Sequence, residues 1–433
     1  MFHAKIRSVL SVWTHKTLRR NHGFGKLIMT LKFLRPRTMR RNPKLTTERN
    51  GARRHAMLIL HSSDDIYGAD RVVDRVAKLV AANGNVPVDV WRPTDLSPSS
   101  QTLARSSFVP GITEESVPFP VLRRANITVS GIFKLVKMLP KTARKMYNRQ
   151  YSSVYIGTSA CLLLAPLARL LCIHKVTLHL QENWVGYEGR LLGILGLACT
   201  KIICISESTK NQLPRRLQSR AVVVLNGMAA PEYVPSAVPA RLDSELTFVV
   251  ASRWNSWKGH KTLLAAWSIA AVPHRLLILG GPPKSGAHVD VPAIVSELPN
   301  FENITVIGEV PDVLPYLLAA DVVIVPSDDP EPFGLVAIEA FSLGRPVIGS
   351  NGGGLAEIID DSENGWLYEI KDVHSLANVL QNLTAEEATR CGLNARDKFE
   401  RKYELAAFET GILGALGLPH DRTSLVECHG RSL

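Results

Sequence analysis

The sequence predicts an α/β protein of two Rossmann-like domains that face each other across a cleft. The first observation is the length, because 433 residues suffice for two or three domains. The second is a series of short, continuously apolar runs separated by helical segments, a pattern typical of parallel sheets covered on both faces. The third is that this series stops once, at a Pro- and Ala-rich stretch, and then begins again.

The first series begins at Met57. The segment "GADRVVDRVAKLVAANG" has the period of an amphipathic helix. Six apolar runs are expected as strands: "MLILHSS", "VPVDVW", "SVYIG", "KVTLHL", "KIICIS" and "AVVVL". We therefore predict an N-terminal domain over residues 57–235.

The second series follows "NGMAAPEYVPSAVPARLDSE", whose composition predicts a linker between about Asn226 and Glu245. Its expected strands are "LTFVVASRW", "HRLLILGG", "ITVIGEV", "DVVIVPS" and "RPVIGSN". We predict a C-terminal domain over residues 236–415 and a tail over residues 416–433. Open parallel sheets bind ligands beyond the carboxyl ends of their strands, so the loops after the strands are the expected site.

Charge is concentrated at the N-terminus. Residues 1–56 contain five Lys, ten Arg and one acid, Glu48, which gives them a net charge of +14. Because the whole chain has a net charge of +12, the remaining residues carry −2. Such an arm suits an anionic membrane surface or a nucleic acid, or is a disordered or peripheral segment without a role. It lacks the long apolar region of a secretory signal.

A second basic region covers residues 121–150, with eight Lys or Arg and no acid. Ile132, Phe133, Val136 and Leu139 are expected on one helix face, with lysines nearby. This composition fits a helix lying on a membrane and fits an ordinary solvated helix equally well.

The apolar stretches and the cysteines indicate the cellular compartment of the protein. No apolar stretch reaches the roughly 20 uncharged residues that span a bilayer. The six cysteines show no CxxC pair and no metal-ligand spacing, which favours a reducing compartment. We expect a cytoplasmic protein, either soluble or peripheral on the cytoplasmic face of the membrane.

Residues 330–359, "PEPFGLVAIEAFSLGRPVIGSNGGGLAEII", begin as a loop and continue as an apolar helix. Gly334 and Leu335 fall in the first turn, where backbone N–H groups lack partners within the helix. These donors and the positive end of the helix dipole favour a phosphate or diphosphate. Glu339, about one and a half turns later, is expected to accept hydrogen bonds from sugar hydroxyls in the cleft. Glu331 is expected at the cleft mouth, facing the uncharged part of the ligand.

A second element, "ASRWNSWKGHKTLL", supplies cations to the same domain. Arg253 ends a predicted strand, and Lys258 precedes Gly259 at the start of a predicted helix. The guanidinium offers a planar fork of donors and the ammonium a compact charge, both suited to phosphate oxygens. Together with the preceding segment, they favour a diphosphate site.

The block from Glu331 to Ile359 resembles the E-x7-E signature of family 4 retaining glycosyltransferases, enzymes of the GT-B fold. The resemblance extends from about Met57 to Ala415. It is carried, in the family's order, by "YGADRVV", "KIICISESTKNQL", "VVVLNGM", "SRWNSWKGHKTLLAAW", "ITVIGEV" and "ENGWLYE".

This resemblance implies a metal-independent, retaining hexosyltransferase that takes a nucleotide-diphosphate sugar as donor and requires no cofactor. Arg253 and Lys258 would bind and stabilise the leaving diphosphate, and Glu331 would contact the transferred sugar. Glu339 would contact the ribose. The remaining donor contacts are assigned to Val310 near the base and to Phe333, Gly334 and Leu335 near the phosphate or sugar.

In the N-terminal half, the resemblance implies an acceptor site. "HSSDDIYGADRVV" fits the family's glycine loop through Gly68, although Tyr67 stands where a second glycine is common. After "SVYIG" many relatives place a histidine, whereas this chain reads "TSACLL" and offers Ser159. His179 and Glu182 in "TLHLQENW" are therefore the expected acceptor-side groups, with His179 as a catalytic candidate or a structural histidine.

Other functions compete with the enzyme. A catalytically silent GT-B binding or scaffolding subunit is the main alternative, although Glu331, Arg253 and Lys258 are all present. Nucleic-acid binding depends on the basic arm alone, which has few aromatic residues to stack on bases. An epimerase or phosphorylase would need other cleft groups. We therefore expect sugar transfer to a glycan or lipid-linked acceptor in bacterial polysaccharide or glycolipid biosynthesis.

Overall fold

The structure is a computed structural model that describes residues 56–63, 68–84, 86–96, 109–123, 128–231, 245–283, 286–299 and 301–419. Residues 1–55, Tyr67, most of the expected linker and the tail beyond residue 419 lie outside the described residues. The predictions for the basic arm and for Tyr67 therefore remain predictions.

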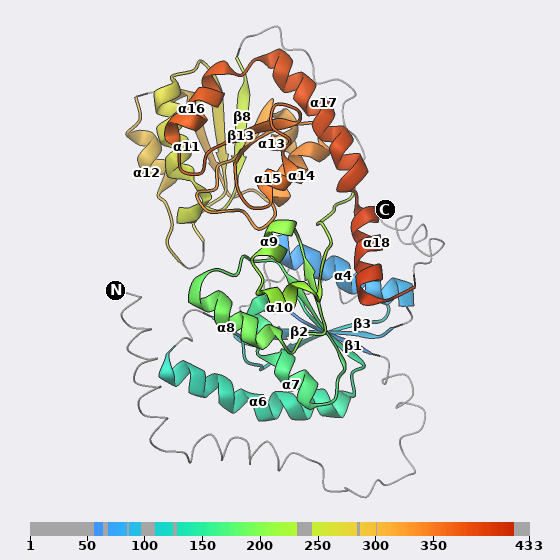
Figure 1. Ribbon diagram of the computed structural model, residues 1–433. Helices are drawn as coiled ribbons and strands as arrows, with labels where there is room; N and C mark the ends of the chain where they lie inside the picture. Colours follow the sequence, from blue (N-terminus) through green and yellow to red (C-terminus); the bar gives the residue numbers. More distant parts are fainter. Residues whose placement is uncertain are drawn as a thin grey trace, which may run out of the picture.

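The N-terminal domain contains a parallel sheet in the order β3-β2-β1-β4-β5-β6-β7 (Figure 1). The six predicted apolar runs all form strands of this sheet. The bounds are β1 (Met57–Leu60), β2 (Val88–Pro93), β3 (Ile112–Val117), β4 (Ser153–Ile156), β5 (Lys175–Leu180), β6 (Lys201–Cys204) and β7 (Ala221–Val223).

Helices cover both faces of this sheet. One face is packed by α6 (Val129–Arg149), α7 (Leu164–Leu170) and α8 (Gly186–Gly196), and the other by α4 (Gly68–Gly84). The shorter helices are η2 (Ser159–Cys161), α9 (Glu207–Asn211) and α10 (Arg215–Gln218). The α4 helix coincides with the predicted amphipathic segment, because its apolar positions recur at helical spacing and face the sheet.

The C-terminal domain repeats this plan with a parallel sheet in the order β10-β9-β8-β11-β12-β13. The strands are β8 (Thr247–Ala251), β9 (Arg275–Leu279), β10 (Ile304–Gly308), β11 (Val322–Val325), β12 (Val347–Ser350) and β13 (Gly365–Tyr368). The prediction of two parallel α/β sheets is confirmed. The strands β3 and β13, each at one edge of its sheet, were not predicted, whereas the opposite edge strands β7 and β10 were.

Two groups of helices enclose the second sheet. One face carries α11 (His260–Ala270), α12 (Val291–Ser296) and α16 (Val373–Asn382). The other face carries α13 (Leu314–Ala319), α14 (Leu335–Ser342), α15 (Leu355–Ile358) and α17 (Ala385–Lys402). Two 3-10 turns, η3 (Ser256–Lys258) and η4 (Phe301–Asn303), lie in the connections.

The last helix, α18 (Leu405–Leu416), crosses to the other domain and lies beside α4 (Figure 1). Phe408 and Ile412 join the apolar cluster of the N-terminal domain, in contact with the side chains of α4. Residues 405–415 were expected in the C-terminal domain and residue 416 in the tail, whereas the structure packs this helix against the N-terminal domain. The reason is that an apolar helix at the end of the chain is most stable where an uncovered apolar sheet face remains, and here that face belongs to the first sheet.

Candidate active site at the domain interface

A pocket of about 560 Å³ lies between the two domains, lined by loops that follow the strands. The N-terminal domain contributes Gly68, Arg71 and Glu182, among others, and the C-terminal domain contributes most of the remainder. Loops after β8, β9, β10 and β11 converge there because the carboxyl ends of parallel strands share one edge of a sheet.

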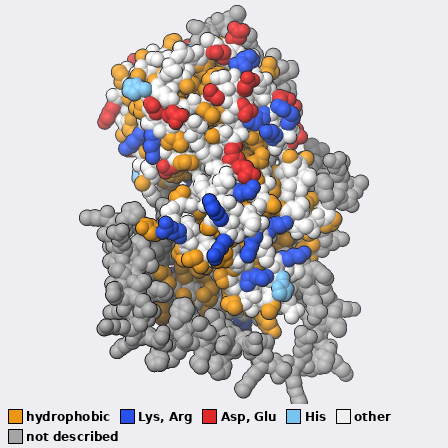
Figure 2. All heavy atoms as spheres, in the orientation of Figure 1, with side chains coloured by type: hydrophobic (Ala, Val, Ile, Leu, Met, Phe, Trp, Pro, Cys, Tyr) orange, Lys and Arg blue, Asp and Glu red, His pale blue; other side chains and the backbone are white. Residues whose placement is uncertain are grey.

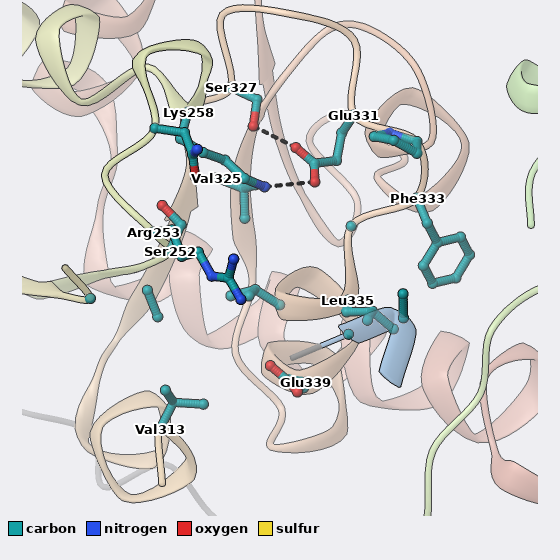
Figure 3. Close-up of a pocket in the computed structure, with 18 of the residues that line it drawn as sticks. Ser252, Arg253, Lys258, Val313, Val325, Ser327, Glu331, Phe333, Leu335 and Glu339 are labelled. Atoms are coloured by element: carbon teal, nitrogen blue, oxygen red, sulfur yellow. Dashed lines mark hydrogen bonds and ion pairs between the residues drawn. The ribbon is translucent and has the colours of Figure 1, made fainter. Parts of the chain in front are cut away.

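Glu331 lines this pocket and is held there by two side chains (Figure 3). Its carboxylate accepts hydrogen bonds from the Ser327 hydroxyl at 2.6 Å and from the Lys258 ammonium at 2.8 Å. The residue is only 8% exposed, so both contacts are strong for their type. Ser327 was not predicted as a site residue, although its place directly after β11 was a usable signal.

Two glycines of the "GGG" segment, Gly353 and Gly354, pack against the backbone of Glu331. Gly353 has a φ of +64°, and a Cβ there would lie 2.1 Å from the Glu331 carbonyl oxygen. The neighbouring Gly354 N–H donates a hydrogen bond of 2.7 Å to the same oxygen. Only glycine allows the two backbones to approach so closely, and this contact sets the position of the Glu331 loop.

Arg253 and Lys258 lie on the opposite wall. Arg253 follows β8, and in Figure 3 its guanidinium points into the space between the Lys258–Glu331 pair and Glu339. Lys258 ends η3, with its ammonium 4.2 Å from the centroid of the Trp257 ring. The structure thus brings both predicted cations to the pocket that contains both predicted glutamates.

Two helix starts meet at this pocket. Gly334 is the N-cap of α14, with a φ of +116°, and Leu335 is its first residue. Gly68 begins α4 in the other domain, and a Cβ on it would lie 2.7 Å from Leu335 Cδ1. Both residues line the pocket, so two helices of opposite domains direct their positive ends toward it.

Glu339 lies deeper along α14 and also lines the pocket. Its carboxylate is 3.4 Å from the Arg71 guanidinium of α4, an ion pair that joins the two domains. Burial raises the pKa of Glu339, and the charges of Arg71 and Arg75 oppose this rise. Arg71 was not predicted as a site residue; its position in the first turn of α4 was the only local signal.

The other predicted donor-side residues are also found here. Val310 lines the pocket just beyond β10. Phe333 lines it too, but its ring is buried and packs edge-on against Tyr403, with the centroids 6.2 Å apart. Its main role is therefore to anchor the loop that carries Glu331.

The expected acceptor side is formed by Glu182 and its neighbours. The Glu182 carboxylate accepts a 2.6 Å hydrogen bond from the Ser159 hydroxyl, which in turn accepts one of 2.8 Å from Trp184 Nε1. Burial raises the pKa of Glu182, while its hydrogen bonds with Ser159 oppose this. Glu182 and Gly68 line the pocket, and Ser159 supports Glu182 from behind.

His179 does not line the pocket, so of the two alternatives the structure favours a structural histidine over a catalytic one. It lies within β5, fully buried, and shares a hydrogen bond with the Tyr155 hydroxyl. Burial lowers the pKa of His179 to about 3, so the imidazole is neutral near physiological pH. The physical reason is the twofold alternation of a strand, which directs His179 into the sheet packing while later residues of the same segment reach the cleft.

Sequence comparison shows that part of this chain is similar to known proteins. Residues 236–401 match the family described as Glycosyl transferases group 1. An uncharacterized glycosyltransferase of Methanocaldococcus jannaschii is 28% identical over 217 residues, which cover 49% of this chain and 57% of that protein. A D-inositol 3-phosphate glycosyltransferase of Rhodococcus jostii is 35% identical over 194 residues, covering 41% of this chain and 42% of that protein. The chain therefore spans about half the length of these curated relatives.

The fold is shared with solved structures. The Anabaena protein HepE, crystallised in complex with UDP and glucose, has a TM-score of 0.65 and 19% identity. The alignment covers 84% of this chain and 99% of that one. This chain therefore has the GT-B fold, and its residues 236–401 match the group 1 glycosyl transferases.

Proposed function

We propose that this protein transfers a sugar from a nucleotide-diphosphate sugar to an acceptor hydroxyl, with retention of the anomeric configuration. The main supporting observation is that one pocket between the domains contains the starts of α4 and α14, the cations Arg253 and Lys258, and the carboxylates Glu331 and Glu339. This set of groups matches the parts of such a donor, which has an anionic diphosphate between two hydroxyl-rich sugars.

Each part of the donor has a counterpart in the pocket. Arg253, Lys258 and the first N–H groups of α14 bind the diphosphate. Glu339 accepts hydrogen bonds from the ribose, and Glu331 from the transferred sugar. Val310 lies against the base. A nucleotide-sugar donor is supported by the relatives, since the Anabaena structure was determined with UDP and glucose and the Rhodococcus protein is a glycosyltransferase.

The chemistry follows from this placement. The bond between the anomeric carbon and the diphosphate oxygen breaks, and the acceptor oxygen bonds to the same face of that carbon. The acceptor proton passes to the leaving diphosphate. Arg253, Lys258 and the α14 N-terminus stabilise the charge that develops on the diphosphate, the role that a metal cation has in other transferases. No metal or cofactor takes part in this proposal.

We further propose that the acceptor is a glycan or lipid-linked precursor of a polysaccharide or glycolipid, on the cytoplasmic side of the membrane. The five cysteines of the described residues are all free, which fits a reducing compartment. Among the described helices, none combines the length and the apolar character needed to cross a bilayer.

The decisive experiment measures nucleotide release from a panel of sugar nucleotides by the full-length protein. Release from one donor, abolished in Lys258→Ala and lowered about 100-fold in Glu331→Gln, would support the proposal. Lys371→Ala is the matched control, because Lys371 forms its ion pair with Asp329 at the surface and does not line the pocket. Its release rate should equal that of the wild type.

Binding is measured on the same panel by the shift in melting temperature. A melting shift without turnover, even with added lipid-linked acceptors, would identify a silent GT-B binding subunit instead of an enzyme. The absence of any shift would refute the pocket as a nucleotide-sugar site.

A further inference from the structure

One face of α8 is apolar and exposed to solvent. Tyr187, Leu191 and Ile194 are 59%, 55% and 65% exposed, and their spacing puts them on one side of the helix. Val185, just before the helix, is exposed as well. A contiguous apolar surface of this kind on a folded domain indicates an interaction site.

This face begins beside the candidate active site. The chain leaves β5 at Leu180, lines the pocket with Gln181 and Glu182, and contacts the C-terminal domain through Asn183. Trp184 is buried, and the exposed face starts at the next residue. A ligand lying on α8 would therefore have one end within a few residues of the acceptor-side carboxylate.

Helix α6, which α7 separates from α8, also exposes apolar side chains. Ile132, Phe133 and Val136 are exposed there, as predicted, whereas Leu139 of the predicted face packs partly into the core. The Lys137 ammonium lies 4.5 Å from the Phe133 ring centroid, and on α8 the Arg190 guanidinium lies 5.5 Å from that of Tyr187. Both helices thus pair an exposed aromatic ring with a cation.

The helices on this side of the N-terminal domain are rich in basic residues. Helices α6, α7, α8 and α10 together contain ten Lys or Arg and one acid, Glu188. Helix α7 lies between α6 and α8, and Pro214 at the start of α10 packs against Gly193 of α8. On the face shown in Figure 2, blue side chains lie among orange ones over the lower, N-terminal domain, whereas red side chains gather on the upper domain.

The positive charge of this surface indicates which kind of partner binds it. The chain's own residues 1–56 carry +14, and a second copy would present the same positive layer, so both would be repelled. A nucleic acid would match the charge and stack on Tyr187 and Phe133, but it would leave the exposed aliphatic side chains of Leu191, Ile194, Ile132 and Val136 without an apolar partner. An anionic lipid bilayer satisfies both the cations and the aliphatic side chains.

We propose that the outer face of α6 and α8 docks on an anionic bilayer, and that the acceptor is an amphiphile whose apolar chain stays in the bilayer while its head group enters the pocket beside Glu182. This inference rests on the proposed transfer reaction and names the physical class of its acceptor. Docking at α8 keeps the pocket entrance at the lipid surface and removes the need to extract the apolar chain.

The test is co-sedimentation of the full-length protein with vesicles of phosphatidylcholine alone and of phosphatidylcholine mixed with phosphatidylglycerol. We expect binding to the anionic vesicles only. The triple variant Tyr187→Ser, Leu191→Ser, Ile194→Ser should bind them about tenfold more weakly, since each side chain buries apolar area at the interface. A matched triple variant, Ile269→Ser, Phe301→Ser, Leu393→Ser, removes comparably exposed side chains of the C-terminal domain and should bind like the wild type.

Unchanged binding by the α8 variant, equal losses in both triple variants, or no binding of the wild type would each overturn the proposal. A dimer that dissociates in the α8 variant would also overturn it, in favour of a second copy as the partner. Nucleotide release is measured in parallel. Release without vesicle binding refutes the docking face alone, whereas vesicle binding without release from any donor refutes the transfer reaction and leaves the docking face in place.

Discussion

Ser206 and Pro332 join the two domains beside the pocket, with the Ser206 hydroxyl donating a 2.8 Å hydrogen bond to the Pro332 carbonyl. On the other side of Glu331, the Asn183 side-chain amide donates one of 2.7 Å to the Pro330 carbonyl. The N-terminal domain therefore contacts the Glu331 loop both before and after the carboxylate. The contact between the two domains and the placement of the Glu331 loop are therefore coupled through these two bonds.

Loss of either bond should slow the reaction without unfolding the protein. We expect Ser206→Ala and Asn183→Ala each to lower kcat/KM for donor hydrolysis about two- to tenfold, the equivalent of one hydrogen bond of roughly 0.5–1.5 kcal/mol. Ser206→Ala also loses some stability, because the same hydroxyl accepts a hydrogen bond from the Thr209 N–H at the start of α9. Ser296→Ala removes a hydroxyl that bonds only within its own helix region, to the Ala293 carbonyl, and is the control. Equal rates for all three variants would show that the interdomain bonds do not position Glu331.

Gly353 should be intolerant of a side chain for a reason separate from its positive φ. Gly417 has a nearly equal φ of +67°, but a Cβ there would meet no atom within 4 Å. We expect Gly353→Ala and Gly417→Ala both to lose about 1–2 kcal/mol of unfolding free energy from the left-handed conformation. Only Gly353→Ala should also lose donor turnover, because its Cβ displaces the Glu331 carbonyl. Denaturant unfolding and nucleotide release distinguish the two effects, and full turnover in Gly353→Ala would contradict this account.

His179 should matter for stability and not for chemistry. His179→Leu leaves the buried Tyr155 hydroxyl without its partner, at an expected cost of about 1–3 kcal/mol in unfolding free energy. The double variant His179→Leu, Tyr155→Phe removes both polar groups and should recover part of that loss. Donor hydrolysis should stay within about twofold of the wild type in both variants. A large loss of turnover in a variant with unchanged stability would restore the catalytic role.

Because Glu182 is a buried carboxyl, we expect the difference in stability between the wild type and Glu182→Gln to depend on pH. Its pKa is raised by burial in the folded state, so the folded protein holds this proton more tightly than the unfolded chain, whose carboxyl titrates near about 4.3. The folded state therefore loses stability as pH rises from that value through the raised pKa. Glu182→Gln cannot ionise and can still accept from Ser159, so its melting temperature should exceed that of the wild type increasingly toward neutral pH. A difference that is constant with pH, or that shrinks as pH rises, would contradict the burial argument.

The sequence by itself determined the elements whose signals are local. Apolar runs such as "VVIV" in β11 specify buried strands, and glycines such as Gly334 specify where a helix begins, because both depend on near neighbours in the chain. The same reasoning located Arg253, Lys258, Glu331 and Glu339, since each follows a strand or lies on the helix that starts there. Parallel topology then placed all four at one edge of one sheet.

The polar edge strand β3 and the docking of α18 were decided only by the tertiary structure. The β3 sequence, "ITEESV", is polar because that strand has a neighbour on one side only and is partly exposed, so it lacks the apolar run of a central strand. Helix α18 reads as apolar, but nothing in its own residues indicates which domain has a free face for it.

The side-chain partners were also decided by tertiary packing. His179 and Glu182 are three residues apart, yet one is sealed in the sheet and the other lines the pocket. The ion pair of Lys258 with Glu331 and the bond of Ser206 to Pro332 join residues 73 and 126 positions apart. Such contacts depend on how whole domains pack, because short-range patterns carry information only about neighbours along a helix or strand.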